Sequence, residues 1–319
     1  RHTISLCDWS SDVCSSDLRI APRVPWWLRP VAMLVVSSMV AALATSPIAA
    51  AHFNRMAQYG LLANLLAVPV MGTLVMPAGV IGAVLALVGL EAPALWVMGI
   101  GTEWMLWVAR FVSSLGGAVT GVAKPPAPVV PLMGFGAVLC ILCWRPPSRR
   151  GWLTRAGVGL GALLLAASAV LWMTARRPLL LIAPEGEAAG LMTPAGRAIS
   201  KPSGGAFVVS TWLQEDGDMG DQEQAAARPA WTGDARDRQA PLPHGWQVWH
   251  LTGKGSGARA ATACRPDRIV VASEPVDIDG APPCLLLDPK RLRRSGAVAI
   301  HMTADGPRIT PGATMRLSR

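Results

Sequence analysis

The sequence is poor in charge and in the side chains that catalysis uses. Charged residues make up only 15% of its 319 residues, and it holds one tyrosine and five histidines. Soluble proteins usually carry about a quarter charged residues. Hydrophobic residues reach 51% and are concentrated before residue 175. The composition therefore excludes an ordinary soluble protein and predicts a membrane region followed by a soluble tail.

Metal-site spacing is also missing. The tail histidines are His244, His250 and His301, and no two of them lie within two residues of each other. A dinuclear hydrolytic site needs histidines and carboxylates in a cluster. The glycine-rich run at 253–257 lacks the spacing of a phosphate-binding loop and predicts a surface turn. We expect no metal site, no cofactor and no enzymatic activity.

The positive charge is uneven along the chain. The net charge is +9, yet the tail from residue 176 holds 18 basic and 15 acidic side chains. Such a balance gives no basic stripe of the kind that nucleic-acid readers show. Residues 1–22 differ in composition from everything after them, and we interpret them as a sequence artefact. On this interpretation the chain is a C-terminal fragment of a longer protein.

Five apolar segments follow, and each is a candidate membrane span. They cover residues 31–50, 60–90, 93–115, 129–144 and 156–173. About 20 apolar residues cross a bilayer core, so residues 60–90 are longer than one span needs. This segment is either one kinked helix or a re-entrant piece followed by a span. Residues 93–115 form either an interfacial helix or a helix that lines a pore.

Four arginines between residues 145 and 155 give the strongest orientation signal in the chain. Positive charge in short loops favours the cytoplasmic side. With five spans that start inside, residue 176 is expected outside. The tail, 176–319, contains short β-type runs at 179–183, 207–213, 246–251, 268–272, 284–288 and 297–301, with a flexible insert at 214–243. The fold class is thus an α-helical polytopic membrane bundle followed by a small β-rich soluble domain.

Residues 46–77 combine an apolar background with polar side chains and three prolines. Polar side chains at membrane depth mark a cavity, a pathway or a helix contact by default. Prolines persist there only where neighbours or water satisfy the freed carbonyls. The stretch therefore predicts a multi-helix bundle that encloses something.

Within this stretch, HFNRMAQYGLLANLLAVPV followed by VMP resembles the membrane core of the ComEC family of competence proteins. The residues that carry the resemblance are His52, Phe53, Asn64, Leu65, Leu66, Pro69 and Pro77. It covers roughly residues 23–173, so we assign 23–175 as a ComEC-like transmembrane domain. The tail is similar to the shortened C-terminal region of alphaproteobacterial members. Many relatives end instead in a metallo-β-lactamase-like nuclease, whose H-x-H-x-D-H pattern is missing here, so nuclease activity is not carried over.

The resemblance implies an inner-membrane channel component that passes single-stranded DNA during natural transformation. Its channel-lining candidates are His52, Asn64, Glu103 and Arg110, whereas Phe53, Pro69 and Pro77 are motif residues with a structural role. For Asn64 a helix–helix hydrogen bond remains an alternative, and for His52 an interfacial position. The implied partners are single-stranded DNA, membrane lipid, a cytoplasmic helicase-like ATPase, a periplasmic DNA receptor and a second copy of the chain. The alternative function is a membrane-anchored binding or assembly protein with a periplasmic β-rich domain.

Cys264 and Cys284 are the two cysteines of the tail, and each stands at the edge of a β-type run. Neighbouring antiparallel strands would bring their Cα atoms within the ~4.4–6.8 Å that a disulfide allows. A periplasmic tail would favour the bond, because that compartment is oxidising. A cytoplasmic tail would leave two buried thiols.

Overall fold

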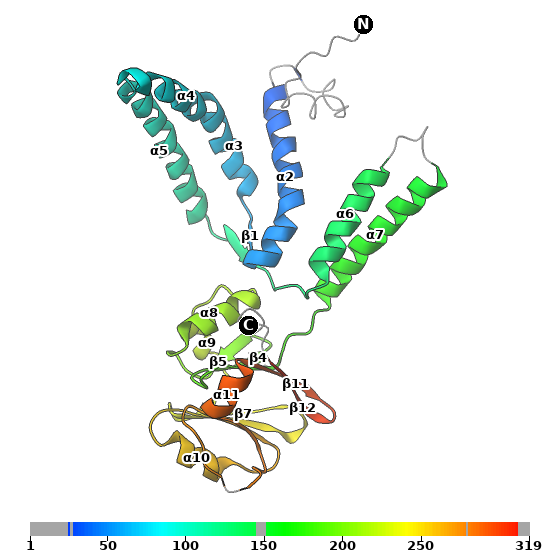
Figure 1. Cartoon of the computed structure of the whole chain (residues 1–319), viewed down its shortest axis with the longest axis vertical. Helices are drawn as coiled ribbons and strands as arrows, with labels where there is room; N and C mark the ends of the chain where they lie inside the picture. The colour runs from blue at the N-terminus through cyan, green and yellow to red at the C-terminus, as the bar shows by residue number, and fades with distance from the viewer. Residues whose placement is uncertain (1–24, 26–27, 145–150, 279, 312–319) are drawn as a thin grey trace. The chain divides into compact units, whose positions relative to one another are not determined.

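The computed structural model describes residue 25 and residues 28–144, 151–278 and 280–311. The predicted artefact at residues 1–22 lies outside them. The chain divides into two compact units, one made of residues 1–48 and 56–120 and the other of residues 49–55 and 121–319. We describe each unit by itself (Figure 1).

The first unit is helical. It holds most of α2 (Arg29–Phe53), α3 (Gly60–Val70), the π-helix η2 (Met71–Val75), α4 (Met76–Leu85), the 3₁₀ turn η3 (Ala86–Val88) and α5 (Ala92–Ser114). The short strands β1 (Arg55–Ala57) and β2 (Val119–Gly121) pair with each other where the two units join in sequence. Residues 60–88 run as one continuous helical segment. Of the two alternatives for this segment, the structure thus has the long helix.

The π-helix η2 lies between Pro69 and Pro77. Neither proline can donate a backbone hydrogen bond, so the helical ladder loses two links within nine residues. The Thr73 hydroxyl donates to the Pro69 carbonyl oxygen at 2.7 Å. The altered winding therefore follows from the two prolines. Single π-turns of this kind occur frequently at functional sites.

Glycines allow α5 to pack closely against the segment before it. A Cβ on Gly101 would lie 2.6 Å from Val75 Cγ2, and one on Gly82 would lie 3.5 Å from the Ala94 Cβ. Gly89, at φ 72°, ends the α4–η3 segment before α5 turns back. Small residues at such contacts let helix backbones approach each other in a membrane.

Three helical segments among the described residues have the length and hydropathy of a membrane span. They are Val31–Phe53, Gly60–Val88 and Trp152–Met173. The other two predicted spans are also helices. However, α5 does not reach the required hydropathy, and α6 (Val129–Cys143) has 15 residues.

Helices α6 and α7 (Trp152–Met173) form a hairpin in the second unit. A Cβ on Gly136 would lie 2.9 Å from the Gly161 carbonyl oxygen, and one on Gly157 would clash with Cys143 Sγ. Cys140 Sγ lies 3.8 Å from the Val158 carbonyl oxygen. The two cysteines thus serve as small packing residues of a helix contact.

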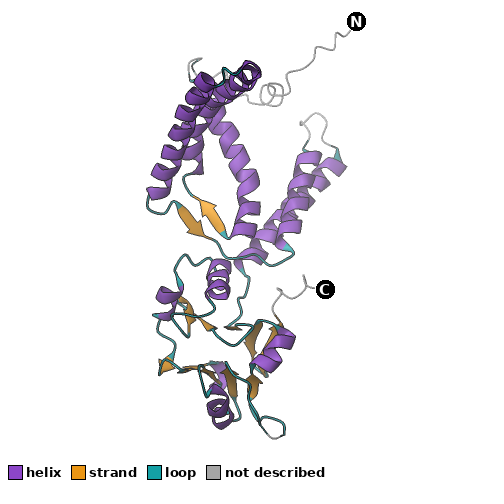
Figure 2. Cartoon of the chain, turned by 60° about the vertical axis from the view of Figure 1, so that its left-hand side comes forward, coloured by secondary structure: helices purple, strands orange, loops and turns teal. Residues whose placement is uncertain are grey.

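The tail contains two five-stranded sheets (Figure 2). The first is antiparallel and has the order β12 (Gly306–Pro311), β11 (Val298–Thr303), β3 (Leu180–Ile182), β4 (Ala189–Thr193), β5 (Gly196–Ile199). The second has the order β10 (Leu285–Leu287), β9 (Arg268–Ala272), β8 (Gln247–Leu251), β7 (Asp237–Pro241), β6 (Thr232–Gly233). In this sheet β10, β9 and β8 are parallel, and β7 and β6 are antiparallel.

The apolar cores show that the tail has four layers. The main core joins the inner faces of both sheets, with Leu180 and Ile300 from one and Val248 and Ile269 from the other. A second core packs α10 (Ser256–Ala263) on the outer face of the β8–β10 sheet. A third packs α8 (Ala206–Glu215) and α9 (Gln222–Ala226) on the outer face of the other sheet. The last helix, α11 (Pro289–Ser295), contributes Leu292 to the main core.

Two sequence expectations about the tail need correction. Residues 207–213, expected as a strand, lie in α8. Their buried members are Val209, Trp212 and Leu213, a spacing typical of one helix face, whereas Phe207 is 84% exposed. The insert at 214–243 contains α9, β6 and β7. The other five β-type runs form strands.

Candidate functional site

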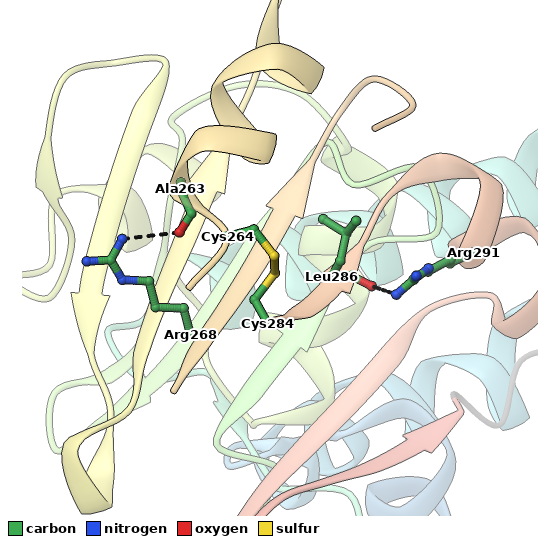
Figure 3. The surroundings of a disulfide bond; sticks show 6 residues. All are labelled: Ala263, Cys264, Arg268, Cys284, Leu286 and Arg291. Atoms are coloured by element: carbon green, nitrogen blue, oxygen red, sulfur yellow. Dashed lines mark hydrogen bonds between the residues drawn. A yellow bond between two sulfur atoms is a disulfide. The ribbon is translucent and has the colours of Figure 1, made fainter. Parts of the chain in front are cut away.

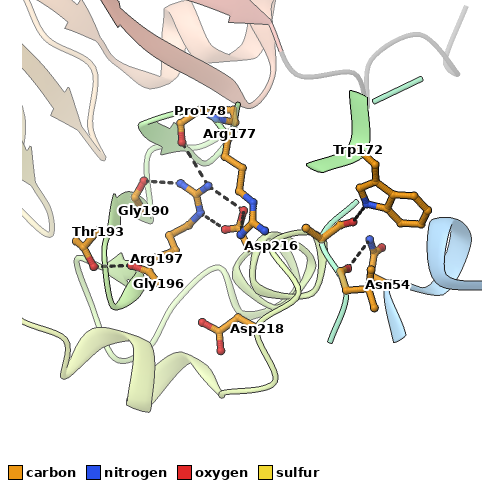
Figure 4. Close-up of polar contacts among 12 residues, drawn as sticks. Asn54, Trp172, Arg177, Pro178, Gly190, Thr193, Gly196, Arg197, Asp216 and Asp218 are labelled. Carbon is orange, nitrogen blue, oxygen red and sulfur yellow. Dashed lines mark hydrogen bonds and ion pairs between the residues drawn. The ribbon is translucent and has the colours of Figure 1, made fainter. Parts of the chain in front are cut away.

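The polar motif at the end of α2 forms a tight corner. Asn54 follows the helix at φ 56° and is only 5% exposed. Its Nδ2 donates to the Val122 carbonyl oxygen at 3.3 Å, and the Val122 amide donates to the Asn54 carbonyl oxygen at 2.9 Å (Figure 4). Asparagine adopts this left-handed backbone more readily than most residues. Asn54 is therefore a structural residue, whereas His52 and Phe53 beside it are exposed.

Three side-chain hydrogen bonds link α3 and the residues just before it to α5 and the residues just after it. The Tyr59 hydroxyl donates to the Gly116 carbonyl oxygen at 3.1 Å, and Trp104 Nε1 donates to the Leu66 carbonyl oxygen at 3.1 Å. Gln58 Nε2 donates to Thr120 Oγ1 at 2.9 Å just before α3. The two helices therefore run antiparallel. Asn64 lies between Tyr59 and Leu66, the two positions that these bonds join to the α5 side, and so it is beside the part of α5 that follows Trp104.

The predicted channel residues of this helix pair are solvent-exposed in the isolated chain. Asn64, Glu103 and Arg110 all belong to the first unit, and each has an exposed side chain. Glu103 and Arg110 stand about 10 Å apart along the helix and do not pair. His52 belongs to the second unit. The structure thus brings three of the four candidates onto one helix pair. The motif residues Pro69 and Pro77 flank its π-helix.

An aromatic row runs along α5 next to these residues. The ring centroids of Trp104 and Trp107 are 5.1 Å apart, and those of Trp107 and Phe111 are 5.5 Å apart with nearly parallel rings, at 4°. This row was not among the residues selected from the sequence. Its signal is the spacing of three and four residues, which puts aromatic side chains on one helix face.

In the tail, Cys264 and Cys284 are joined by a disulfide with a Cα–Cα distance of 5.2 Å (Figure 3). The pairing is the expected one, but the strands beside it, β9 and β10, are parallel rather than antiparallel. Cys264 ends α10 and Cys284 immediately precedes β10. Parallel strands start at the same edge of a sheet, and so the two cysteines meet there.

The glycine-rich turn lies between β8 and α10, at the carboxyl end of a parallel strand. The Glu274 carboxylate accepts hydrogen bonds from the Gly255 amide at 2.8 Å and from the Gly257 amide at 3.4 Å. Backbone amides at a helix start favour anions. Here the anion is a side chain of the same domain, which supports the interpretation of a structural turn.

His250 is completely buried between the sheets. Its Nε2–H donates to the Gly186 carbonyl oxygen at 2.9 Å, whereas Nδ1 has no partner among the described residues. Burial lowers the pKa of His250 from 6.5 to about 4. The ring is thus neutral near pH 7. The described residues contain no cluster of three His, Cys, Asp or Glu side chains suited to hold a metal ion.

Together the helices and the four-layer tail define a membrane protein with an appended domain. Residues 12–147 match the family described as "Competence protein". The membrane region is thus similar to the competence proteins, consistent with the ComEC resemblance. This similarity associates the chain with DNA uptake during competence. Searches of curated proteins and of solved structures gave no match.

Proposed function

We propose that this chain is an inner-membrane channel component that passes single-stranded DNA during natural transformation. The competence-family match over residues 12–147 carries the proposal. Two features of that segment support it: exposed polar side chains on apolar helices, and a π-helix between two prolines. Neither feature is needed by an inert membrane anchor.

A path for a polyanion has to be wet and weakly polar, so that the strand does not bind tightly and stop. The proposed lining residues are His52, Asn64, Glu103 and Arg110. Arg110 attracts phosphates, Glu103 repels them, and the amide of Asn64 offers hydrogen bonds without charge. The opposed charges of Glu103 and Arg110, two turns apart on the same face of α5, keep the net attraction small.

The proposed role is transport rather than catalysis, so the energy has to come from a partner. We propose a cytoplasmic helicase-like ATPase as the motor and a periplasmic DNA receptor as the donor of the strand. Membrane lipid surrounds the helices, and a second copy of the chain is a further candidate partner.

We place the tail in the periplasm. The disulfide of the tail supports this placement, because such bonds persist in oxidising compartments. The arginine signal at 145–155 supports it from sequence, although residues 145–150 lie outside the described residues. A reporter fused after Arg319 that is active only in the cytoplasm would overturn the placement.

A deletion strain tests the transport role. We expect loss of entry of labelled DNA into the cytoplasm, with DNA still bound at the cell surface, and recovery when the gene is supplied again. Asn64→Leu should then lower DNA entry more than protein abundance, because Leu keeps the apolar helix but removes the amide. Asn64→Gln is the matched control. Unchanged entry per molecule of Asn64→Leu protein would remove Asn64 from the path.

The alternative is a membrane-anchored binding or assembly protein with a periplasmic domain. The observation that favours it is the tail itself, which has its own cores and its own disulfide. A deletion strain that still takes up DNA, but assembles a partner complex poorly, would favour this alternative over a channel.

A further inference from the structure

The aromatic row on α5 consists of Trp104, Trp107 and Phe111. At about 100° per residue these side chains fall within a 60° arc of the helix. Their exposed fractions are 42%, 51% and 41%. Each ring therefore has a free part, although the rings already contact each other.

The row lies between the packed and the charged sides of α5. The buried side contains Ala94, Gly101 and Val108. Arg110 follows about 60° beyond Trp107 on the other side, and it forms no ion pair among the described residues. Aromatic faces and an available cation thus stand side by side along one helix.

The row is also held in place. The hydrogen bond from Trp104 Nε1 to the Leu66 carbonyl oxygen ties its first ring to α3. Trp107 packs on that ring, and Phe111 stacks on Trp107. A fixed platform loses little side-chain entropy when a flat ligand stacks on it.

A lipid surface fits the row less well. The helix α5 has 23 residues, long enough to span, but it does not reach the hydropathy of the three candidate spans. Glu103 and Arg110 both border the row on the side away from the buried face, and both are exposed. A face that borders on two charged side chains is better suited to a hydrated ligand with flat apolar rings than to lipid tails, and Arg110 is the side chain that can contact a negative group of such a ligand.

We propose that Trp107 and Phe111 form a base-stacking platform for single-stranded DNA, with Arg110 contacting the phosphate backbone. This inference rests on the proposed transport function and adds a contact mode to it. Stacking tolerates any sequence, because every base has an aromatic face. A transporter of arbitrary DNA needs this tolerance.

The test uses the full chain in lipid nanodiscs and two fluorescein-labelled probes of equal length. One is oligothymidylate, and the other is an oligomer of abasic sites with the same phosphate charge. Fluorescence anisotropy gives the affinity of each. We expect wild-type protein to bind oligothymidylate more tightly. Trp107→Ala should weaken that binding by about 5- to 100-fold, as loss of one stacked base predicts, and change abasic binding less than about twofold.

Three further variants separate stacking from folding and from charge. Trp107→Phe keeps a ring and should retain most of the preference for bases. Trp107→Leu keeps apolar bulk without an aromatic face and should lose it. Arg110→Gln should weaken both probes equally and reduce the salt dependence of binding.

Trp96→Ala is the matched control. Trp96 lies on α5 and is 70% exposed, but it lies about 12 Å before Trp104 along the helix. The Trp96→Ala variant should bind both probes as wild-type protein does. Equal loss of both probes in Trp107→Ala, or no loss of either, would overturn the platform. If Trp107→Ala and Trp107→Leu bind both probes as wild-type protein does but are incorporated less well into nanodiscs, the row contacts lipid. This result would also overturn the platform.

The outcomes distinguish this inference from the function on which it rests. If a deletion strain takes up DNA normally, the transport proposal fails and the platform fails with it. If the deletion strain loses uptake while Trp107→Ala and Trp107→Leu bind both probes as wild-type protein does, only the platform fails.

Discussion

Arg197 and Asp216 form a two-contact ion pair at the end of α8, with Arg197 Nε 2.6 Å from Asp216 Oδ2 and Nη2 3.2 Å from Oδ1. The Arg197 side chain is completely buried. It also donates to the carbonyl oxygens of Gly190 and Pro178 (Figure 4). A Cβ on Gly190 would lie 2.7 Å from Arg197 Cδ, so the glycine leaves the space for this side chain. The pair joins α8 to the β4–β5 hairpin.

Arg197→Ala should destabilise the tail by about 3–5 kcal/mol, because it leaves the Asp216 carboxylate with little solvent and without its main partner. Arg177→Ala is the control. Arg177 Nη1 lies 3.7 Å from the same carboxylate, but its side chain is 39% exposed, so its loss should cost no more than about 1 kcal/mol. Urea unfolding of both variants measures the difference. Equal effects would contradict a special role for the buried pair.

Gly101→Ala should destabilise the packing of α5 against η2 by about 1–3 kcal/mol, since the added methyl group would lie 2.6 Å from the stiff Val75 side chain. Gly99→Ala is the control on the same helix, because a Cβ there meets no atom within 4 Å. Alanine is the better helix former, so this control should be neutral or slightly stabilising. Thermal stability of the two proteins in detergent tests the prediction. A Gly99 variant as unstable as the Gly101 variant would contradict it.

The stability of the tail should fall as the pH is lowered from about 6.5 toward 4. The pKa of His250 is lowered to about 4 by burial, so in this window the unfolded chain binds a proton that the folded chain does not. The loss between pH 7.5 and pH 5 should be about 2 kcal/mol from this group. Urea unfolding at the two pH values measures it in wild-type protein and in His250→Gln, which cannot titrate. A pH dependence as steep in the variant as in wild type would show that other groups cause it.

Local patterns predicted five of the tail strands because their apolar runs are buried, and β9 with four buried residues in succession is the clearest case. The strand β7, DRQAP, is polar, and it is stabilised by pairing with β8 and by the contact of Arg259 Nε with Asp237 Oδ1 at 2.8 Å. Such partners are distant in sequence. The β-branched run in α8 favours a strand locally, yet its burial against β5 requires a helix face.

In the candidate site, too, some features follow from the local sequence and others depend on partners that are distant in the sequence. Pro69 and Pro77 predicted an interruption of the long helix. That the interruption is a π-helix could not be predicted, because it depends on the winding of the whole segment. Polar side chains at Asn64 and Arg110 were selected because they are rare in apolar helices. Asn54 stands in the same polar stretch, but its structural role comes from the Val122 backbone, which is 68 residues later in the sequence. The aromatic row was also readable from its spacing of three and four residues, but it was not among the residues selected from the sequence.

The disulfide gives the last prediction. Cys264→Ser and Cys284→Ser should each destabilise the tail by about 3 kcal/mol in the chain-entropy model, since the bond closes a loop with a sequence separation of 20. The loop includes β9, whose residues enter two of the three cores, so the loss should reach the sheet and not only the loop. The Arg268 side chain donates to the Ala263 carbonyl oxygen at 3.1 Å (Figure 3). This hydrogen bond can hold the end of α10 in place when the disulfide is absent. For this reason we expect the serine variants to fold.

Alkylation of protein from intact cells, followed by mass spectrometry without reduction, tests whether the bond forms. The expected result is one Cys264–Cys284 peptide pair, together with alkylated Cys140 and Cys143, which are free thiols in the α6–α7 hairpin. Replacing Cys140 and Cys143 by alanine is the control and should leave the unfolding of the tail unchanged. Alkylated Cys264 and Cys284 in that preparation would contradict the bond and remove the strongest structural support for a periplasmic tail, because an oxidising compartment joins two cysteines that lie this close.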